Sequence, residues 1–199
     1  MVELSGSNLA LSNVTIVNVI VSTKADRQIN IEMLATNLTH AIYEPESFSG
    51  LIYRRCDPKA TIIMFATGKI VSIGSSSEGI ARESILTTIS EIVNIEKENI
   101  TVERITTENV VAISDIGYQI DIKKAVNCGI KALYRPEQFP GVIYRVRDII
   151  VALIFKSGKI LSVGSKSEEE AKSTINLTYK ILKESGCLYN RRALGDSHE

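Results

Sequence analysis

Four phenylalanines are the residues whose type and spacing point most directly to a role for this chain. Phe48, Phe65, Phe139 and Phe155 are its only phenylalanines, and they form two pairs, because Phe139 and Phe155 follow Phe48 and Phe65 by 91 and 90 residues. A phenyl ring offers a flat apolar surface to a core or to a partner. A single Phe is most often a core residue, but two symmetric pairs at predicted loop tips and strand ends favour a contact surface.

The residues that catalysis needs do not form a pattern in this sequence. The only histidines are His40 and His198, and no serine–histidine–aspartate set, carboxylate cluster or P-loop is evident. The glycines of Thr67–Lys69 and Ser157–Lys159 are typical of hairpin turns rather than of phosphate-binding loops. We therefore expect no enzyme, no metal site and no cofactor.

Composition and charge narrow the class of protein further. The 199 residues include 23 Lys plus Arg and 23 Asp plus Glu, so a positive surface for an anionic partner must be local. Cys56, Cys128 and Cys187 have no C-x-x-C and no metal-ligand spacing, which favours reduced thiols. No stretch approaches the ~20 apolar residues of a membrane helix, and the N-terminus lacks signal-peptide features. We expect a soluble intracellular protein without membrane contact.

The phenylalanine pairs belong to an internal repeat of roughly 90 residues. YEPESFSGLIYR at Tyr43–Arg54 recurs as YRPEQFPGVIYR at Tyr134–Arg145. FATGKIVSIGSSSE at Phe65–Glu78 recurs as FKSGKILSVGSKSE at Phe155–Glu168. The offset falls from 91 to 90 between these motifs, so the second copy has lost one residue in between.

The repeat sets the expected domain organisation. Asn18 and Asn109 also correspond, at an offset of 91 residues. We expect two pseudo-symmetric subdomains over residues 1–98 and 99–186, followed by a polar, disordered tail over 187–199. Such a protein presents a near-symmetric surface, which suits a near-symmetric partner such as duplex DNA.

Each copy is predicted to form a strand, a short helix, a three-stranded meander and a long helix. In the first copy the expected strands are Val14–Val21, Leu51–Arg54, Ala60–Phe65 and Lys69–Ile73, and the last of them ends at Gly74. A short helix is expected over Ile31–Leu38, with Asn30 as its cap and with Met33 and Leu34 on its inner side. The long helix is expected to begin at Ser76 or Ser77. The apolar positions of the long helices are Ala81, Ile85, Ile89 and Ile92, and Ala171, Ile175, Tyr179 and Leu182. The prediction is an α+β fold: one long antiparallel sheet with helices on one face.

Both faces of this sheet are predicted to be apolar. Side chains alternate between faces, and Ile62, Met64 and Ile70 can face the helices. The residues of the opposite face are apolar too: Ile20, Ile63, Phe65, Val71 and Ile73 in the first copy, and Val111, Leu153, Phe155, Leu161 and Val163 in the second. Two long helices are too few to cover both faces, so we interpret the second face as an exposed interaction surface. A sheet packed on both faces is the alternative.

The quoted motifs resemble the TATA-box-binding protein family, above all its archaeal members. FPGVIYR with LIFKSGKILSVGSKSEEEA carries the resemblance in the second copy, and GLIYRRCDPKATIIMFATGKIVSIGS carries it in the first. The resemblance runs from about Ile16 to Leu182. It implies a saddle whose curved sheet lies on the DNA minor groove, with helices on the convex face. Insertion of apolar wedges that kink the duplex is a general property of that family.

The resemblance also implies which residues contact DNA. Asn18 and Asn109 match paired asparagines near the dyad, where an amide can donate to adenine N3 or thymine O2. The other implied contacts are the wedge pairs Phe48 with Phe65 and Phe139 with Phe155; the apolar residues Ile20, Ile63, Val71, Ile73, Val111, Leu153, Leu161 and Val163; and the phosphate-binding cations Arg54, Lys69, Arg145, Lys159 and Lys166.

The sequence departs from the family pattern at several positions. Ile73 and Val163 stand where the family usually has Thr, which removes a hydroxyl beside each Asn and leaves strict TATA preference open. Ser76 stands where the family favours Lys. The second copy lacks a match for Pro58 and has a shorter loop around Asp148.

Two functions are compatible with these features. In the family, acidic residues of the second stirrup, the loop that reads YRPE here, contact transcription factor B. In this sequence Arg135 reverses one of those charges, while Glu137 and Gln138 remain. The protein is expected to be a general initiation factor that kinks an A·T-rich promoter element and recruits transcription factor B and, indirectly, RNA polymerase. The alternative is a divergent paralog that acts mainly as a protein-interaction module with relaxed DNA specificity. The apolar face leaves room for a homodimer of the free protein, and the expected location is the nucleoid in an archaeon or the nucleus in a eukaryote.

Overall fold

The structure is a computed structural model that describes residues 11, 13–127 and 132–190. Clustering of contacts divides the chain into two compact units. One unit holds Ile16–Val110 with Lys166–Glu168, and the other holds the described residues of Met1–Thr15, Val111–Ser165 and Glu169–Glu199. The units therefore follow the two sequence repeats, apart from short segments exchanged at their borders.

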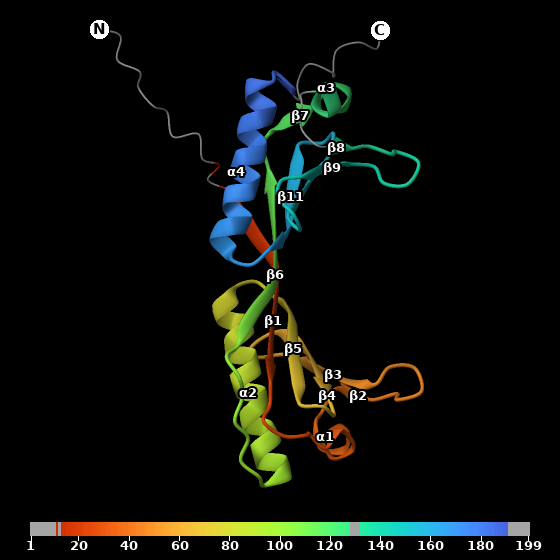
Figure 1. Cartoon of the computed structure of the whole chain (residues 1–199), viewed down its shortest axis with the longest axis vertical. Helices are drawn as coiled ribbons and strands as arrows, with labels where there is room; N and C mark the ends of the chain where they lie inside the picture. The colour runs from red at the N-terminus through yellow and green to blue at the C-terminus, as the bar shows by residue number, and fades with distance from the viewer. Residues whose placement is uncertain (1–10, 12, 128–131, 191–199) are drawn as a thin grey trace, which may run out of the picture. The chain divides into compact units, whose positions relative to one another are not determined.

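Ten strands form one sheet in the order β2-β3-β4-β5-β1-β6-β11-β10-β9-β8. The first repeat contributes β1 (Thr15–Lys24), α1 (Ile31–Asn37), β2 (Ala41–Ile42), β3 (Gly50–Arg55), β4 (Ala60–Phe65), β5 (Lys69–Ser75) and α2 (Glu78–Glu96). The second contributes β6 (Thr106–Asp115), α3 (Ile122–Asn127), β8 (Ala132–Leu133), β9 (Val142–Arg145), β10 (Val151–Ile154), β11 (Lys159–Ser165) and α4 (Glu168–Glu184). Within each repeat, the long helix lies along the strands of that repeat (Figure 1). The predicted α+β architecture with one antiparallel sheet is confirmed.

Local sequence explains where the helices of the first repeat begin. The Asn30 side chain accepts a hydrogen bond from the Met33 amide at 3.0 Å, and the Ser77 hydroxyl accepts one from the Ile80 amide at 3.2 Å. Both are N-caps that satisfy a free amide of the first helical turn. Helix α2 ends at Lys97, whose φ of 59° lies in the left-handed region.

The core of each repeat lies between its long helix and its strands. Ile62, Met64 and Ile70 are fully buried, as predicted for residues that face α2. Small hydroxyl side chains share this layer, and the hydroxyls of Ser72 and Ser84 form a hydrogen bond at 2.7 Å. The helix-facing side of the sheet is therefore closed by the protein itself.

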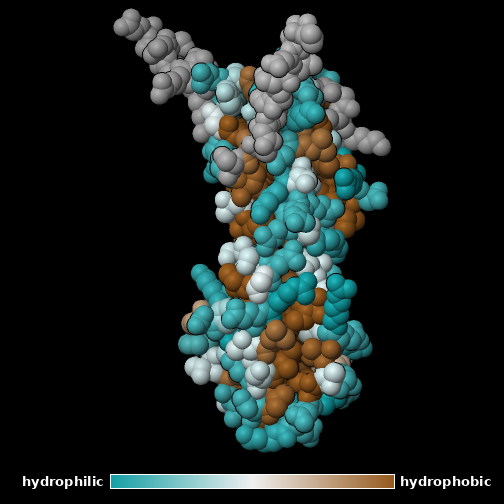
Figure 2. Space-filling view, turned by 90° about the vertical axis from the view of Figure 1, so that its left-hand side faces the viewer, coloured by the Kyte–Doolittle hydropathy of each residue, from teal (hydrophilic) through white to brown (hydrophobic). Residues whose placement is uncertain are grey.

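The outer surface of α2 is more apolar than a solvated helix requires. Leu86 is 55% exposed, and Ile89 and Val93 are half-buried on the same side, at helical spacing. Figure 2 shows hydrophobic side chains gathered on the lower half of this face, where α2 lies. Among the residues that the structure describes, no helix combines the length and the apolar composition needed to cross a membrane.

Two predicted details of the first repeat are wrong. Met33 is 41% exposed, because Ile31 and Leu34 fill the inner side of the short helix α1. Strand β5 does not end at Gly74 but continues to Ser75, because glycine readily adopts the φ of 93° that this position has within the strand. The two-residue strands β2 and β8 were also absent from the prediction.

The C-terminal segment needs a correction as well. We predicted a disordered tail from residue 187, yet Cys187 is buried and β12 (Leu188–Asn190) pairs with β7 (Tyr118–Ile120) in a separate two-stranded sheet. Short pairing of this kind depends on partners distant in sequence, so local polarity does not reveal it. The remainder of the predicted tail lies outside the described residues.

Candidate nucleic-acid interface

The sheet face opposite the helices keeps its apolar side chains partly exposed. Along β4, Ile62 and Met64 are buried, whereas Thr61, Ile63 and Phe65 are half-buried. The structure places every predicted apolar residue of this face in the same class: Ile20, Ile63, Val71, Ile73, Val111, Leu153, Leu161 and Val163 are all half-buried. Because no segment that the structure describes covers them fully, this face is available to a partner.

Strand register aligns these side chains into an apolar row in each repeat. In the first repeat Ile42 lies opposite Ile52, Ile52 opposite Ile63, and Ile63 opposite Val71. The corresponding row of the second repeat is Leu133, Ile143, Leu153 and Leu161. Directly opposed side chains on one face touch, so each row is a continuous apolar strip across four strands.

Four members of these rows were missed from the sequence: Ile42, Ile52, Leu133 and Ile143. Ile42 and Leu133 are 44% and 49% exposed, at repeat-equivalent positions on the edge strands. Alternation within GLIYR and GVIYR could have identified Ile52 and Ile143, since the apolar residue before each, Leu51 or Val142, is buried. No local signal identifies Ile42 and Leu133, because a two-residue strand has no periodicity.

One phenylalanine pair accompanies each apolar row. The rings of Phe48 and Phe65 lie edge to face with centroids 5.8 Å apart, and those of Phe139 and Phe155 do the same at 5.6 Å. The structure thus brings together both predicted pairs. Edge-to-face contact holds each ring against its partner and leaves flat apolar surface outside; Phe48 is 40% exposed.

A glycine beside each pair is required by space. A Cβ added at Gly50 would lie 2.6 Å from a ring carbon of Phe48 and 3.0 Å from one of Phe65. At Gly141 the corresponding distance to Phe139 is 2.9 Å. The close approach of backbone to ring explains why both copies have Gly at this position.

The amide of Asn18 has a fixed orientation. Its Oδ1 accepts a hydrogen bond from the Gly74 amide at 2.9 Å. Only the oxygen can accept from an N–H, so the side-chain NH₂ remains as the outward hydrogen-bond donor. Asn109 is half-buried at the equivalent position of β6.

The predicted phosphate-binding cations differ in how they are held. Arg54, Lys69 and Lys159 are exposed, and Arg145 donates from Nη1 to the backbone oxygen of Asp148 at 2.8 Å. Lys166 instead donates from Nζ to the backbone oxygen of Glu108 at 2.7 Å. Within the described residues, part of the Lys166 ammonium group is therefore already engaged by Glu108, unlike that of the other predicted lysines.

The Glu108 carboxylate also gathers hydroxyl donors. The Ser22 hydroxyl donates to it at 2.7 Å and the Thr106 hydroxyl at 3.1 Å, while Lys166 Nζ lies 3.5 Å away. The Ser22 hydrogen bond is the main reason why the pKa of Glu108 lies below its usual value, with Thr106 and Lys166 adding to it. No sequence pattern marks this anion beside Asn109.

The predicted partner-binding residues lie on one exposed turn between β8 and β9. Arg135, Glu137 and Gln138 are all exposed, and the turn is closed by the amides of Gln138 and Phe139, which both donate to the Arg135 carbonyl at 2.9 Å. The equivalent turn of the first repeat carries Glu44.

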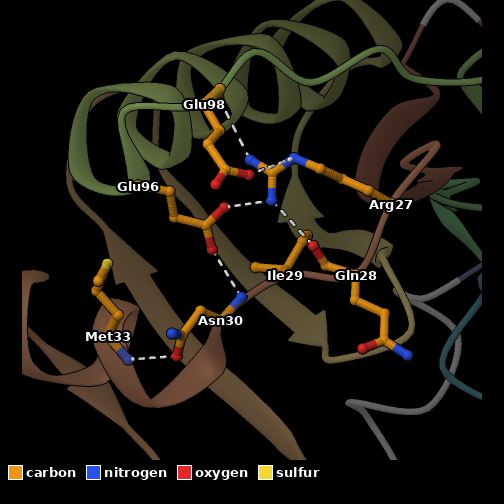
Figure 3. A pocket seen from close by; sticks show the side chains of 7 residues that line it. All are labelled: Arg27, Gln28, Ile29, Asn30, Met33, Glu96 and Glu98. Atoms are coloured by element: carbon orange, nitrogen blue, oxygen red, sulfur yellow. Dashed lines mark hydrogen bonds and ion pairs between the residues drawn. The ribbon is translucent and has the colours of Figure 1, made fainter.

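A polar pocket beside α1 is a structural clamp (Figure 3). Arg27 pairs with Glu96 at 2.6 Å, and the other Glu96 oxygen accepts from the Asn30 amide at 2.6 Å. Arg27 also donates to the backbone oxygens of Glu98 and Asn99 at 3.3 and 3.2 Å. These bonds fasten the loop after β1 to the end of α2, so the cluster supports the fold.

Comparison with known proteins agrees with this architecture. The model of the family "Transcription factor TFIID (or TATA-binding protein, TBP)" matches residues 13–95 and 104–185. The TATA-box-binding protein of Methanocaldococcus jannaschii is 38% identical over 172 residues, which cover 86% of this chain and 94% of the relative. TATA-box-binding protein E of Halobacterium salinarum is 34% identical over 178 residues, covering 88% and 96%.

A solved structure extends the likeness to three dimensions. "Methanococcus jannaschii TBP" superposes with a TM-score of 0.72 at 36% sequence identity and covers 86% of this chain and 99% of its own. The matches span both repeats and are well above the identity at which only a fold is shared. The chain belongs to the TATA-box-binding protein family.

Proposed function

We propose that this protein is a general transcription initiation factor that binds the minor groove of an A·T-rich promoter element. The observation that carries the proposal is the partly exposed apolar row in each repeat, accompanied by an edge-to-face phenylalanine pair. Its role is binding and deformation of DNA, and we propose no catalytic step. Because its named relatives are archaeal, we place it on chromosomal DNA in the cytoplasm.

The apolar rows suit the floor and sugar edges of an A·T minor groove. That groove presents only adenine N3 and thymine O2 as acceptors, so a largely donor-free protein surface loses few hydrogen bonds on binding. The Asn18 amide, and Asn109 at the matching position, would donate to those acceptors. The proposed contacts otherwise are the half-buried residues of the two rows together with Ile20, Ile73, Val111 and Val163.

The phenylalanine pairs are proposed as wedges that kink the duplex. Unstacking a base step costs a few kcal/mol, and an inserted ring offsets part of this cost by replacing the lost stacking. Pairing the rings within the protein reduces the conformational entropy lost on insertion. Exposed Arg54, Lys69, Arg145 and Lys159 would then position the backbone without reading its sequence.

Recruitment of the transcription machinery is assigned to the turn with Arg135, Glu137 and Gln138. Its exposed side chains fit a protein partner, for which we propose transcription factor B, and RNA polymerase through it. Arg135 introduces a cation where the first repeat has Glu44, so we propose a partner surface with a matching acidic group.

The first experiment measures duplex affinity after removing one ring from each pair. Phe65→Ala and Phe155→Ala should each weaken binding to a TATA-like duplex by about tenfold or more, because a wedge is lost at one end of the site. Leu86→Ala is the matched control, since it removes an exposed apolar side chain from the outer surface of α2. Unchanged affinity in both Phe variants, with the fold intact by thermal unfolding, would falsify the wedge assignment.

A specific observation favours a second function, that of a divergent regulator. Ile73 and Val163 present no hydroxyl beside the asparagines, although Thr61 lies directly opposite Ile73 on the same face. Affinities for A·T-rich and scrambled duplexes at two salt concentrations separate the functions. Clear preference for the A·T-rich duplex supports the initiation factor; equal, weak binding to every duplex supports the regulator.

A further inference from the structure

A pocket of about 470 Å³ opens in the second repeat between β7, α3 and the turn that precedes β9. Tyr134, Pro140 and Tyr189 give it aromatic and apolar walls, and Lys123 and Lys156 line it with Asp121. We call it the basic pocket. All of its residues belong to one compact unit.

Hydrogen bonds fix the frame of the basic pocket. The Ile120 amide donates to the Lys156 carbonyl at 3.0 Å, and the Asp121 amide donates to the Cys187 carbonyl at 2.9 Å. Tyr189 is held opposite Gln119 by the β7–β12 ladder. The pocket is therefore largely preformed, which lowers the entropic cost of filling it.

The charges around the basic pocket are predominantly positive. Lys123 and Lys156 are exposed, and over the described part of the chain neither ammonium group has a carboxylate or hydrogen-bond partner. Asp121 opposes them, but its Oδ1 accepts a hydrogen bond from the Lys124 amide at 3.0 Å. Lys124 itself donates to the Gly186 carbonyl at 2.9 Å.

The first repeat does not share this chemistry. Lys123 corresponds to Glu32 at an offset of 91 residues, and Lys156 corresponds to Ala66 at an offset of 90. The equivalent of Pro140 is Ser49. The basic charge therefore does not follow from the fold that the repeats share and is specific to the second repeat.

We propose that the basic pocket binds a short acidic segment of a protein partner. An apolar or aromatic side chain of that segment would pack between Tyr134, Pro140 and Tyr189, and its carboxylates would pair with Lys123 and Lys156. A DNA backbone supplies anions but no apolar group for those walls, which is why the observations favour a peptide. The inference does not depend on duplex binding by the apolar rows.

Two residues of the basic pocket are direct sequence neighbours of the phenylalanine pair. Pro140 directly follows Phe139, and Lys156 directly follows Phe155. Both backbone segments that carry the rings therefore contribute a residue to the basic pocket. A bound segment would restrict the same backbone that positions the rings.

The test uses fluorescence anisotropy of the full chain with a labelled peptide of Asp and Glu around a central Phe and Leu. Lys123→Glu combined with Lys156→Ala installs the residues of the first repeat. This variant should bind the peptide about tenfold more weakly at low salt, since two exposed charge contacts are lost. A peptide with Asn and Gln in place of the acids should bind the original protein at least as weakly.

The matched control is Lys172→Glu with Lys180→Ala, which makes the same charge change on α4 of the same unit. It should leave peptide affinity within about twofold of the original. Equal weakening by both variants would show nonspecific attraction and overturn the proposal. Unchanged peptide binding, with weaker binding of a TATA-like duplex in the Lys123→Glu, Lys156→Ala variant alone, would overturn it in favour of DNA. Tighter peptide binding after removal of residues 191–199 would show that the chain's own C-terminal segment competes for the basic pocket. This result would support the pocket as a peptide-binding site.

Discussion

The two repeats fill one equivalent position in opposite ways. In the first, Arg55 is buried with its side chain 4% exposed, and its Nη1 lies 2.6 Å from Glu91 Oε2. Nη2 donates to the Asp57 carbonyl at 2.9 Å, and the guanidinium lies 5.5 Å from the Tyr53 ring centroid. In the second repeat, the positions of Arg55 and Glu91 are Val146 and Ile181, at offsets of 91 and 90 residues.

This contrast teaches which features the shared fold demands. The phenylalanine pairs, the glycines beside them and the apolar rows recur in both repeats, whereas the residues at the positions of the Arg55–Glu91 ion pair are apolar in the second repeat. Taking a charge pair out of water consumes much of its Coulombic gain, so an apolar pair can replace it at little cost. The supporting side chains therefore differ in chemistry between the repeats, while those of the candidate interface stay aromatic or apolar.

The largest effect is expected from breaking the ion pair on one side. Glu91→Ile should lower the free energy of unfolding by about 3 kcal/mol, because it leaves the Arg55 guanidinium buried without its carboxylate. Arg55→Val with Glu91→Ile, which copies the second repeat, should return to within about 1 kcal/mol of the original. Urea denaturation measures the stability of both variants. A double variant as unstable as the single one would contradict the idea that an ion pair and two apolar residues are equivalent at these positions.

The next effect concerns two glycines that share a backbone conformation but not their surroundings. Gly74 and Gly164 have φ values of 93° and 96°; a Cβ on Gly74 meets nothing within 4 Å, but one on Gly164 collides with the Ile149 carbonyl oxygen. Gly74→Ala should cost about 1 kcal/mol for the left-handed backbone alone. Gly164→Ala should cost about 2 kcal/mol or more, because backbone must also move. Similar melting temperatures for the two variants would show that the loop before β10 yields easily.

Sequence patterns revealed the repeat and its apolar face because both are properties of periodic side chains. The alternation over Ala60–Phe65 and the cap at Ser77 were predictable, since each follows from local geometry. The pairing of β12 with β7 was not, because three residues near residue 190 gain a partner about 70 positions earlier. The Arg55–Glu91 pair was hidden for the same reason: nothing in either segment marks the other as its neighbour.

Within the site, residue type was more informative than strand boundaries. The phenylalanine pairs were identified from type and offset alone, and the structure places the members of each pair in contact. The anchoring of Lys166 by Glu108 was not foreseen, because Glu108 looks like any exposed acid in a strand. Its contacts depend on Ser22 of a different strand.

A smaller effect should appear when a methyl group is added beside each ring pair. The Gly50→Ala methyl meets three side chains, with Phe48 nearest, whereas the Gly141→Ala methyl also lies 3.1 Å from the Ile154 carbonyl oxygen. Gly50→Ala should therefore turn the rings and weaken duplex affinity by about fivefold, with a loss of stability of about 1 kcal/mol or less. Gly141→Ala should lose more stability than Gly50→Ala. Parallel duplex titrations and thermal melts check this; equal stability losses would show that the Ile154 carbonyl moves freely.

The smallest effect separates Glu108 from its first-repeat counterpart, Val17. The pKa of Glu108 is lowered, mainly by the Ser22 hydroxyl, so its ionised form stabilises the fold above the unfolded-state pKa. That contribution is lost as the pH falls through the folded-state pKa. Ser22→Ala should raise the pKa of Glu108, measurable by carbon NMR of the carboxyl group, and should make acid unfolding begin at a slightly higher pH. A pKa that does not change in Ser22→Ala would contradict this assignment.

In the proposed interface, the hydrogen bond from the Gly74 amide to Asn18 Oδ1 limits what Asn18 can recognise. The Asn18 NH₂ group would supply the donors, and A·T and T·A pairs present the same acceptors in the minor groove. Such a contact distinguishes A·T from G·C pairs but does not distinguish which strand carries the adenine. Both repeats have an asparagine at this position, so contacts by these two amides cannot determine the direction of transcription. The direction of transcription must be set by features that differ between the two repeats. The unequal charges of the repeats are such a feature.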